Sequence, residues 1–131
     1  MIYWDTSAII FFLAAGKFSE IKGITRPHAL AEFYSRSTGK GFKVGDKTVR
    51  LKPELAADRI NKLAVQLTFV NLNEQETAKA LKQAAERNIS GGRAHDFLHV
   101  AAAAKAGATE IWTCNEKDFE DLSNIPLKSP A

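Results

Sequence analysis

Acidic residues at four places in the chain are candidates for a shared site, and the first of them, Asp5, lies among apolar neighbours where an unpaired carboxylate would be costly. Asp5 interrupts the opening run YWDTSAII, Glu32 lies within ALAEFY, Asp96 precedes FLHV, and Asp118 follows the apolar run EIWTC. Carboxylates that gather in one place repel one another and raise each other's pKa unless they share a cation. A hard divalent cation such as Mg²⁺ or Mn²⁺ takes oxygen ligands, and a pair of such ions can promote phosphodiester hydrolysis.

Strand and helix signals alternate along the chain and predict how these acids are positioned. Strands are expected at residues 1–4, 68–72 and 110–114, helices at residues 8–15, 28–37, 53–67, 74–88, 93–107 and 115–122, and an extended end at residues 125–130. Residues 42–44 and 48–51 form either a hairpin or part of a long loop. The pattern predicts an α/β fold, a central and mostly parallel sheet with helices on both faces, in one domain over residues 1–131.

Two of the acidic positions follow predicted strands directly. In open α/β sheets, ligands bind outside the carboxyl ends of the strands. Asp5 follows the first strand, and Asn115 and Asp118 follow the strand at residues 110–114. Asp96 lies near the start of the most apolar helix, just after a Gly-Gly pair. We therefore expect an acidic site at this edge of the sheet.

The same segments resemble the PIN domain over essentially the whole chain. The resemblance lies in WDTSAI, AEFYSRS, SGGRAHDFLHVAAAAKAGA and IWTCNEKDF. In size, the chain is similar to VapC-type toxins, and this implies a ribonuclease that depends on Mg²⁺ or Mn²⁺ and is held in check by a cognate antitoxin protein. An antitoxin segment is expected in a groove of the second and third helices, and homodimers are common among similar toxins.

The resemblance also implies roles for individual residues. Catalytic residues are expected at Asp5, Glu32, Asp96 and Asp118, metal ligands at Asp5, Asp96, Asn115 and Asp118, and substrate contacts at Thr6, Ser7 and Thr113. Apart from the resemblance, Arg93 after the Gly-Gly pair is either a further substrate contact, through its guanidinium and a phosphate, or a solvated loop residue. Many members of the family have an aspartate where this chain has Asn115. Its neutral amide would bind a second ion more weakly or leave it to Asp118.

Each acid also has a simpler explanation. Asp5 is an ordinary N-cap for the first helix, Glu32 can pair with Arg36 one turn later, and Asp96 and Asp118 lie in the first turns of helices, where the dipole favours a negative charge. What these local roles do not explain is four acidic positions at one sheet edge, in the order of the PIN family. The alternative function is a catalytically decayed PIN-like module that only binds RNA or a protein.

Two further enzyme classes fit the sequence poorly. HDFLH at residues 95–99 resembles the zinc-protease pattern HExxH, but its aspartate is one methylene shorter than the glutamate base of that motif. We expect His99 to be a hydrogen-bonded core residue and His95 to lie near the substrate. A different phosphate-handling α/β enzyme would need a Gly-rich loop or an Asp-x-Asp sequence after the first strand, and WDTSAI has neither.

Composition and charge set the remaining expectations. With 131 residues and 45% hydrophobic content, the chain can bury one core. One cysteine and an apolar run too short to cross a bilayer predict a cytoplasmic protein without a membrane partner. The net charge is +3, but residues 38–52 hold five basic residues and one acid. This basic segment is either a solvated loop or a surface for phosphates or an acidic protein.

Overall fold

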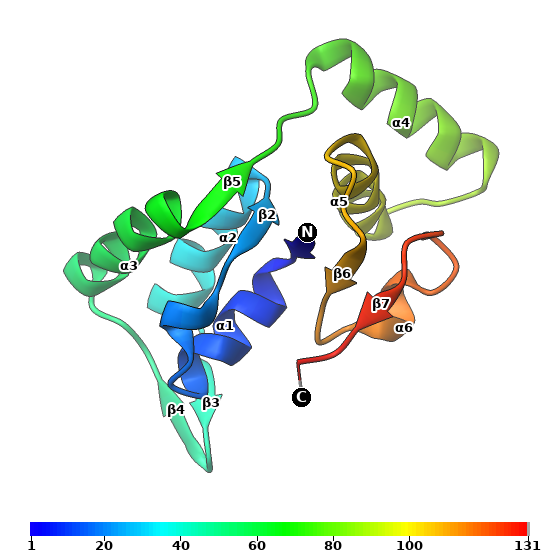
Figure 1. Ribbon diagram of the computed structural model, residues 1–131. Helices are drawn as coiled ribbons and strands as arrows, with labels where there is room; N and C mark the ends of the chain where they lie inside the picture. Colours follow the sequence, from blue (N-terminus) through cyan, green and yellow to red (C-terminus); the bar gives the residue numbers. More distant parts are fainter. Residues whose placement is uncertain (131) are drawn as a thin grey trace.

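The computed structural model describes residues 1–130, and in it five parallel strands pack between two groups of helices (Figure 1). Ala131, the last residue of the predicted domain, lies outside the described residues. The elements are, in chain order, β1 (Ile2–Trp4), α1 (Thr6–Ala14), the short 3-10 helix η1 (Phe18–Glu20), β2 (Gly23–Thr25), α2 (Pro27–Thr38), β3 (Phe42–Val44), β4 (Lys47–Val49), α3 (Pro53–Gln66), β5 (Leu67–Phe69), α4 (Glu74–Glu86), α5 (Arg93–Lys105), β6 (Glu110–Trp112), α6 (Glu116–Phe119) and β7 (Leu127–Lys128).

The main sheet has the strand order β5-β2-β1-β6-β7, and all of its strand pairs are parallel. The chain leaves β1 toward β2 and β5 and later returns to its other side as β6, so the order reverses at β1. Trp4 of β1 pairs with Trp112 of β6. Asp5 and Thr113 therefore leave the sheet side by side, at the edge where ligands bind in such folds.

Alternate residues of the central strands face opposite helix layers, as the pleat of a strand requires. Tyr3 and Ile111 point into the core that α4, α5 and α6 cover. Trp4 and Trp112 point into the core that α1, α2 and α3 cover, and their rings pack 5.2 Å apart. Both tryptophans thus serve the packing of the fold, and the predicted α/β architecture is confirmed.

Helices α1 to α4 begin at a capping side chain or at a proline, both of which are typical of helix starts. The side chain of Asp5 accepts a hydrogen bond from the backbone N–H of Ala8 and caps α1, which begins two residues earlier than expected. Proline occupies the first position of α2 and α3, where its missing N–H costs little. Asn73 and Glu76 form a reciprocal capping box at α4. Helix α5, the most apolar helix of the sequence, is not buried on every side, because His95 on it is exposed.

Strand β2 is absent from the sequence-based expectations. It has only three residues and begins with Gly23, a poor strand former. Gly23 has φ +138°, and a Cβ there would collide with the carbonyl oxygen of Ile2 in β1. Only a residue without a side chain permits this close approach, so β2 is set by its pairing with β1 rather than by local propensity.

The basic segment forms a separate antiparallel hairpin of β3 and β4, which resolves the choice between a hairpin and a loop. Its tip extends away from the helices and the main sheet (Figure 1). In the part of the chain that the structure describes, no helix has the length and apolar character that a membrane crossing requires.

Candidate active site

A pocket with a cavity volume of about 720 Å³ lies at the carboxyl edge of the sheet. Residues from the ends of two strands and from α1, α2 and α5 line it: Asp5, Thr6, Ser7, His28, Ala31, Glu32, Ser35, Arg36, Gly39, Lys40, Asp96, His99 and Asn115. Six of the predicted site residues are among them. The pocket joins positions that are up to 110 residues apart in the sequence.

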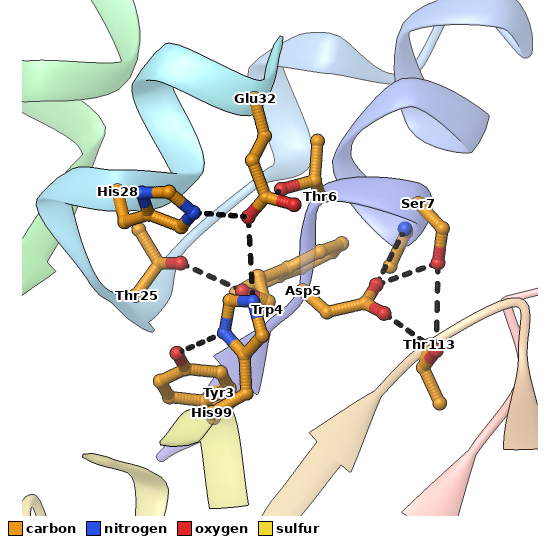
Figure 2. Close-up of polar contacts among 11 residues, drawn as sticks. Tyr3, Trp4, Asp5, Thr6, Ser7, Thr25, His28, Glu32, His99 and Thr113 are labelled. Carbon is orange, nitrogen blue, oxygen red and sulfur yellow. Dashed lines mark hydrogen bonds and ion pairs between the residues drawn. The ribbon is translucent and has the colours of Figure 1, made fainter. Parts of the chain in front are cut away.

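Asp5 is held by hydrogen bonds to both of its carboxylate oxygens (Figure 2). Oδ1 accepts from the Ser7 hydroxyl at 2.6 Å and from the backbone N–H of Ala8 at 3.0 Å. Oδ2 accepts from the Thr113 hydroxyl at 2.6 Å. The simple capping role and the predicted site role are therefore compatible, because the capped carboxylate still lines the pocket.

Ser7 and Thr113 also join α1 to the loop after β6. The Ser7 hydroxyl accepts a hydrogen bond from the backbone N–H of Cys114 at 2.9 Å, and the Thr113 hydroxyl accepts one from Asn115 at 3.0 Å. Thr113 is completely buried beneath Asp5. This placement favours a positioning role for Thr113 over the predicted substrate contact.

Glu32 is held by three side chains that approach the same oxygen, Oε1 (Figure 2). The Thr6 hydroxyl lies at 3.2 Å, His99 Nε2 at 3.3 Å and His28 Nε2 at 3.8 Å. The hydrogen bond from His99 is the main cause that lowers the pKa of Glu32, and it outweighs the opposing effect of burial. Glu32 is thus a carboxylate near neutral pH, bonded differently from the predicted pair with Arg36.

His99 connects Glu32 to Tyr3 in the interior. The Tyr3 hydroxyl lies 2.7 Å from His99 Nδ1, and both residues are buried. Burial raises the pKa of Tyr3 well above its usual range, so the hydroxyl keeps its proton. A neutral His99 with its proton on Nε2 satisfies both neighbours, because it accepts from Tyr3 and donates to Glu32. The expectation of a hydrogen-bonded core histidine is confirmed.

Asp96 differs from the other two acids because it carries unfavourable electrostatics. Burial raises its pKa, the negative charges of Asp118, Asp5 and Glu32 raise it further, and His99 opposes them. The acids of the pocket therefore act on one another, as expected for carboxylates that share a site. A cation bound near Asp96 would relieve this repulsion.

Three other predicted residues lie outside this arrangement or at its margin. Asn115 lines the pocket, whereas Asp118 lines a smaller neighbouring one of about 380 Å³. Asn115 also lines that second pocket, so it lies between the two. Arg93 is exposed and forms an ion pair with Asp121 at 2.5 Å, away from the lining of the larger pocket.

Sequence reasoning missed three basic or titratable residues of the pocket wall. His28, Arg36 and Lys40 line it together with Glu32. These four positions follow one another at intervals of four residues, a spacing that places the helical ones on one face of α2. This four-residue spacing from Glu32 was the sequence signal that could have identified them as site residues. His95, expected near the substrate, stacks on the pocket residue His28 with ring centroids 6.1 Å apart.

The donors in the pocket suit a hard divalent cation by their chemistry. Three acidic residues and one asparagine line the pocket, and their carboxylate and amide oxygens are of the type that Mg²⁺ and Mn²⁺ prefer. Within residues 1–130, however, no group of three or more His, Cys, Asp or Glu side chains is arranged to hold a metal ion. The acids thus line one pocket without forming a ready three-ligand metal site. The side chains of Asp5 and Glu32 are held in place by hydrogen bonds within the protein.

This fold and pocket define a class of α/β protein with an acidic site at the point where the strand order reverses. The chain matches the PIN domain family over residues 2–125 and belongs to that family. It is similar in fold to VapBC-1 from nontypeable Haemophilus influenzae, with 19% identity, 98% of each chain covered and a TM-score of 0.65. It is also similar to VapBC2 from Rickettsia felis bound to a DNA fragment from their promoter, with 15% identity, 100% of each chain covered and a TM-score of 0.68. The comparison with curated proteins found no significant match.

Proposed function

We propose that this protein is a divalent-metal-dependent endoribonuclease and the toxin of a toxin-antitoxin pair. The observation that carries the proposal is the convergence of Asp5, Glu32 and Asp96 in one pocket of a PIN domain. The whole chain would act as one nuclease domain. The RNA substrate and the cytoplasm as its place of action belong to the same proposal.

Asp5 and Asp96 are the residues that would hold a Mg²⁺ or Mn²⁺ ion, with Asn115 as the third ligand. Asn115 lines the same pocket as the two acids, which supports it over Asp118 at this position. A bound divalent ion supplies positive charge that activates water and stabilises a phosphorane-like transition state. The hydrogen bonds from Ser7 and Thr113 fix the orientation of Asp5 before any ligand arrives.

Glu32 would orient the attacking water. Its Oε1 is occupied by Thr6, His28 and His99, which leaves Oε2 to accept a hydrogen bond from water. The lowered pKa keeps the side chain ionised, so Oε2 carries no proton and acts only as an acceptor. The water oxygen would bond to phosphorus and release one proton to bulk water, while the bond from phosphorus to the 3′-oxygen breaks and that oxygen takes up a proton from bulk water. Thr6, Ser7 and Arg93 remain proposed substrate contacts.

RNA cleavage by matched variants tests this function. Purified wild type should cut a labelled structured RNA with Mg²⁺ or Mn²⁺ and not with EDTA, and Asp96→Asn should abolish the cut. The matched control is Asp58→Asn, which removes an exposed carboxylate paired with Lys62 on α3. Equal cleavage by wild type and Asp96→Asn would identify a contaminating nuclease and refute the proposal.

A second candidate function is a PIN domain that binds RNA or a protein without cutting it. Two observations favour it: Asn115 stands where many members have an acid, and the described residues hold no ready three-ligand cluster. Thermal unfolding with and without Mn²⁺ separates the candidates. A decayed site shows neither a rise in Tm nor turnover, whereas the nuclease shows both.

The partner proposed for this chain is a cognate antitoxin protein. The support is the similarity in fold to two structures described as VapBC, together with PIN family membership. A homodimer is the oligomer we propose. Co-expression with the protein encoded by the adjacent gene, followed by size-exclusion chromatography with light scattering, measures both the complex and its stoichiometry.

A further inference from the structure

The basic hairpin, residues 42–49 of β3 and β4, is a second feature of this chain that favours a polyanionic ligand. It pairs Phe42 with Val49, Lys43 with Thr48 and Val44 with Lys47. Both of its lysines are exposed, and the tip extends beyond the helices (Figure 1). A two-stranded ribbon of this kind presents its side chains on two faces at a distance from the protein core.

The base of the hairpin is fixed to the fold. Phe42 is buried in the core with α1, and Val49 packs against the same core. The backbone N–H of Gly41 donates to Arg36 at 2.8 Å, and that of Leu51 donates to Ser37 at 2.8 Å. The hairpin is therefore a positioned projection at the carboxyl end of α2, not a free loop.

The charge of the hairpin and its flanks is concentrated. Residues 38–52 contain one acid, Asp46, and five basic residues: Lys40, Lys43, Lys47, Arg50 and Lys52. All five basic residues are exposed. No ion pair joins any of them to an acid among the described residues, so this charge is not neutralised within the chain. The rest of the chain carries a net charge of −1.

The basic residues continue into the acidic pocket. Arg36 and Lys40 line its wall, and Lys40 precedes β3 by two residues. A phosphodiester that enters a pocket holding Asp5, Glu32 and Asp96 meets repulsion, which neighbouring positive charges can offset. The order along α2 and the hairpin runs from Glu32 through Arg36 and Lys40 to Lys43.

We propose that the hairpin is an RNA-binding arm that holds the phosphate backbone of the strand flanking the cut, with Arg36 and Lys40 guiding the strand into the pocket. The proposal rests on the proposed nuclease function of the pocket. Continuity between the basic line and the pocket favours RNA over an acidic protein, because an RNA cut in the pocket must extend out of it. Backbone contacts of this kind bind RNA without selecting its sequence.

RNA binding in EDTA tests the arm without requiring cleavage. The probe is a fluorescein-labelled single-stranded RNA oligonucleotide, titrated by anisotropy between about 50 and 200 mM salt. The variant is Lys43→Gln/Lys47→Gln. Each lost phosphate contact should lower the salt slope by about 0.7. With this slope, the loss of one contact lowers the affinity for RNA about 5-fold at 0.1 M salt, and the loss of two contacts lowers it about 25-fold.

The matched control is Lys79→Gln/Lys82→Gln, which removes two charges from exposed positions on α4. The proposal expects this control to bind RNA within about twofold of wild type. Equal affinities for the hairpin variant and the control would overturn it, as would no wild-type binding at low salt. If the hairpin variant binds RNA as tightly as wild type but binds a polyglutamate peptide more weakly, the RNA arm is refuted, and the hairpin is instead a surface for an acidic protein.

Cleavage assays distinguish failure of the arm from failure of the nuclease proposal. If the arm holds RNA, Lys43→Gln/Lys47→Gln raises KM and leaves kcat unchanged. If Lys43→Gln/Lys47→Gln binds RNA more weakly than the wild type, and the wild type never cuts RNA, the result upholds the arm and refutes the nuclease. Normal KM and binding in the hairpin variant, with cleavage lost only in Asp96→Asn, would refute the arm and uphold the nuclease.

Discussion

Removing the Tyr3 hydroxyl tests how the protein positions Glu32 from the interior. Tyr3 has no exposed surface, and its hydroxyl lies 2.7 Å from His99 Nδ1. Tyr3→Phe keeps the ring and its edge-on packing against His99, 5.8 Å between centroids, and deletes only the hydrogen bond. The unpaired Nδ1 then stays buried, or the proton of His99 moves to it from Nε2. If the proton moves, His99 Nε2 can no longer donate the hydrogen bond that Glu32 Oε1 accepts.

The expected loss of stability follows from the burial of this hydrogen bond. Leaving a buried polar atom without its partner costs about 1–3 kcal/mol, so we expect the free energy of unfolding to fall by about 2 kcal/mol. An unfolding entropy of about 2.1 cal/mol/K per residue over 131 residues converts this to a fall in Tm of about 7 °C. Tyr34→Phe is the control, because Tyr34 is exposed on α2. It should change Tm by under about 2 °C.

The assay combines calorimetry with NMR of the histidine ring nitrogens. Tyr3→Phe should shift the His99 nitrogen signals, because Nδ1 loses its partner, and should raise the pKa of Glu32 toward its ordinary value. The reason is that the His99 hydrogen bond is the main cause of the lowered pKa. If Tyr3→Phe unfolds at the temperature of Tyr34→Phe and leaves the His99 signals in place, the connection from Tyr3 through His99 to Glu32 does not exist.

Three further predictions concern the acids of the pocket. Asp96→Asn should raise Tm in EDTA at neutral pH, because a carboxyl whose pKa is raised destabilises the fold once it is ionised; a fall in Tm would contradict the electrostatics. Thr113→Val should cost about 1.5–3 kcal/mol, measured by urea unfolding, since Asp5 loses a buried charge-assisted hydrogen bond. Asn115→Asp should tighten Mn²⁺ binding by calorimetry, and Asp118→Asn should change it less, because only Asn115 lines the pocket with the other acids. The reverse order would place the third ligand at Asp118.

The parts of the fold that the sequence predicted are those with local signals. Alternation of strands and helices indicated the parallel sheet, and prolines and capping residues marked the helix starts. Strand β2 carries no such signal, because Gly23 adopts its conformation only against Ile2 of β1. Strand β5 was expected at residues 68–72, and the structure places it at Leu67–Phe69, because Leu67, which continues an apparent helix in the sequence, pairs with Gly23 of β2.

The candidate site also has features that the sequence predicted and features that depend on distant contacts. The positions of Asp5, Glu32 and Asp96 could be predicted from type, order and resemblance, and the pocket brings them together. Beyond the N-cap role of Asp5, what could not be predicted is which distant side chains hold the acids in place. Thr113 reaches Asp5 because β6 lies beside β1, and 108 residues separate the two in the chain. Such contacts depend on strand order and register, which no local pattern encodes.

The three acids of the pocket differ in how the protein stabilises their charges, and this difference links the stability of the fold to ligand binding. Asp5 and Glu32 are satisfied by hydrogen bonds within the protein, so their orientation costs nothing further when a ligand binds. The charge of Asp96 is instead unfavourable because of burial and its neighbouring acids. A ligand that neutralises Asp96 recovers that energy on binding, and any species that binds only the folded state raises its stability. The predicted rise in Tm of Asp96→Asn in EDTA therefore tests this electrostatic cost directly, and a rise in Tm of wild type with Mn²⁺ would show that a bound cation recovers part of it.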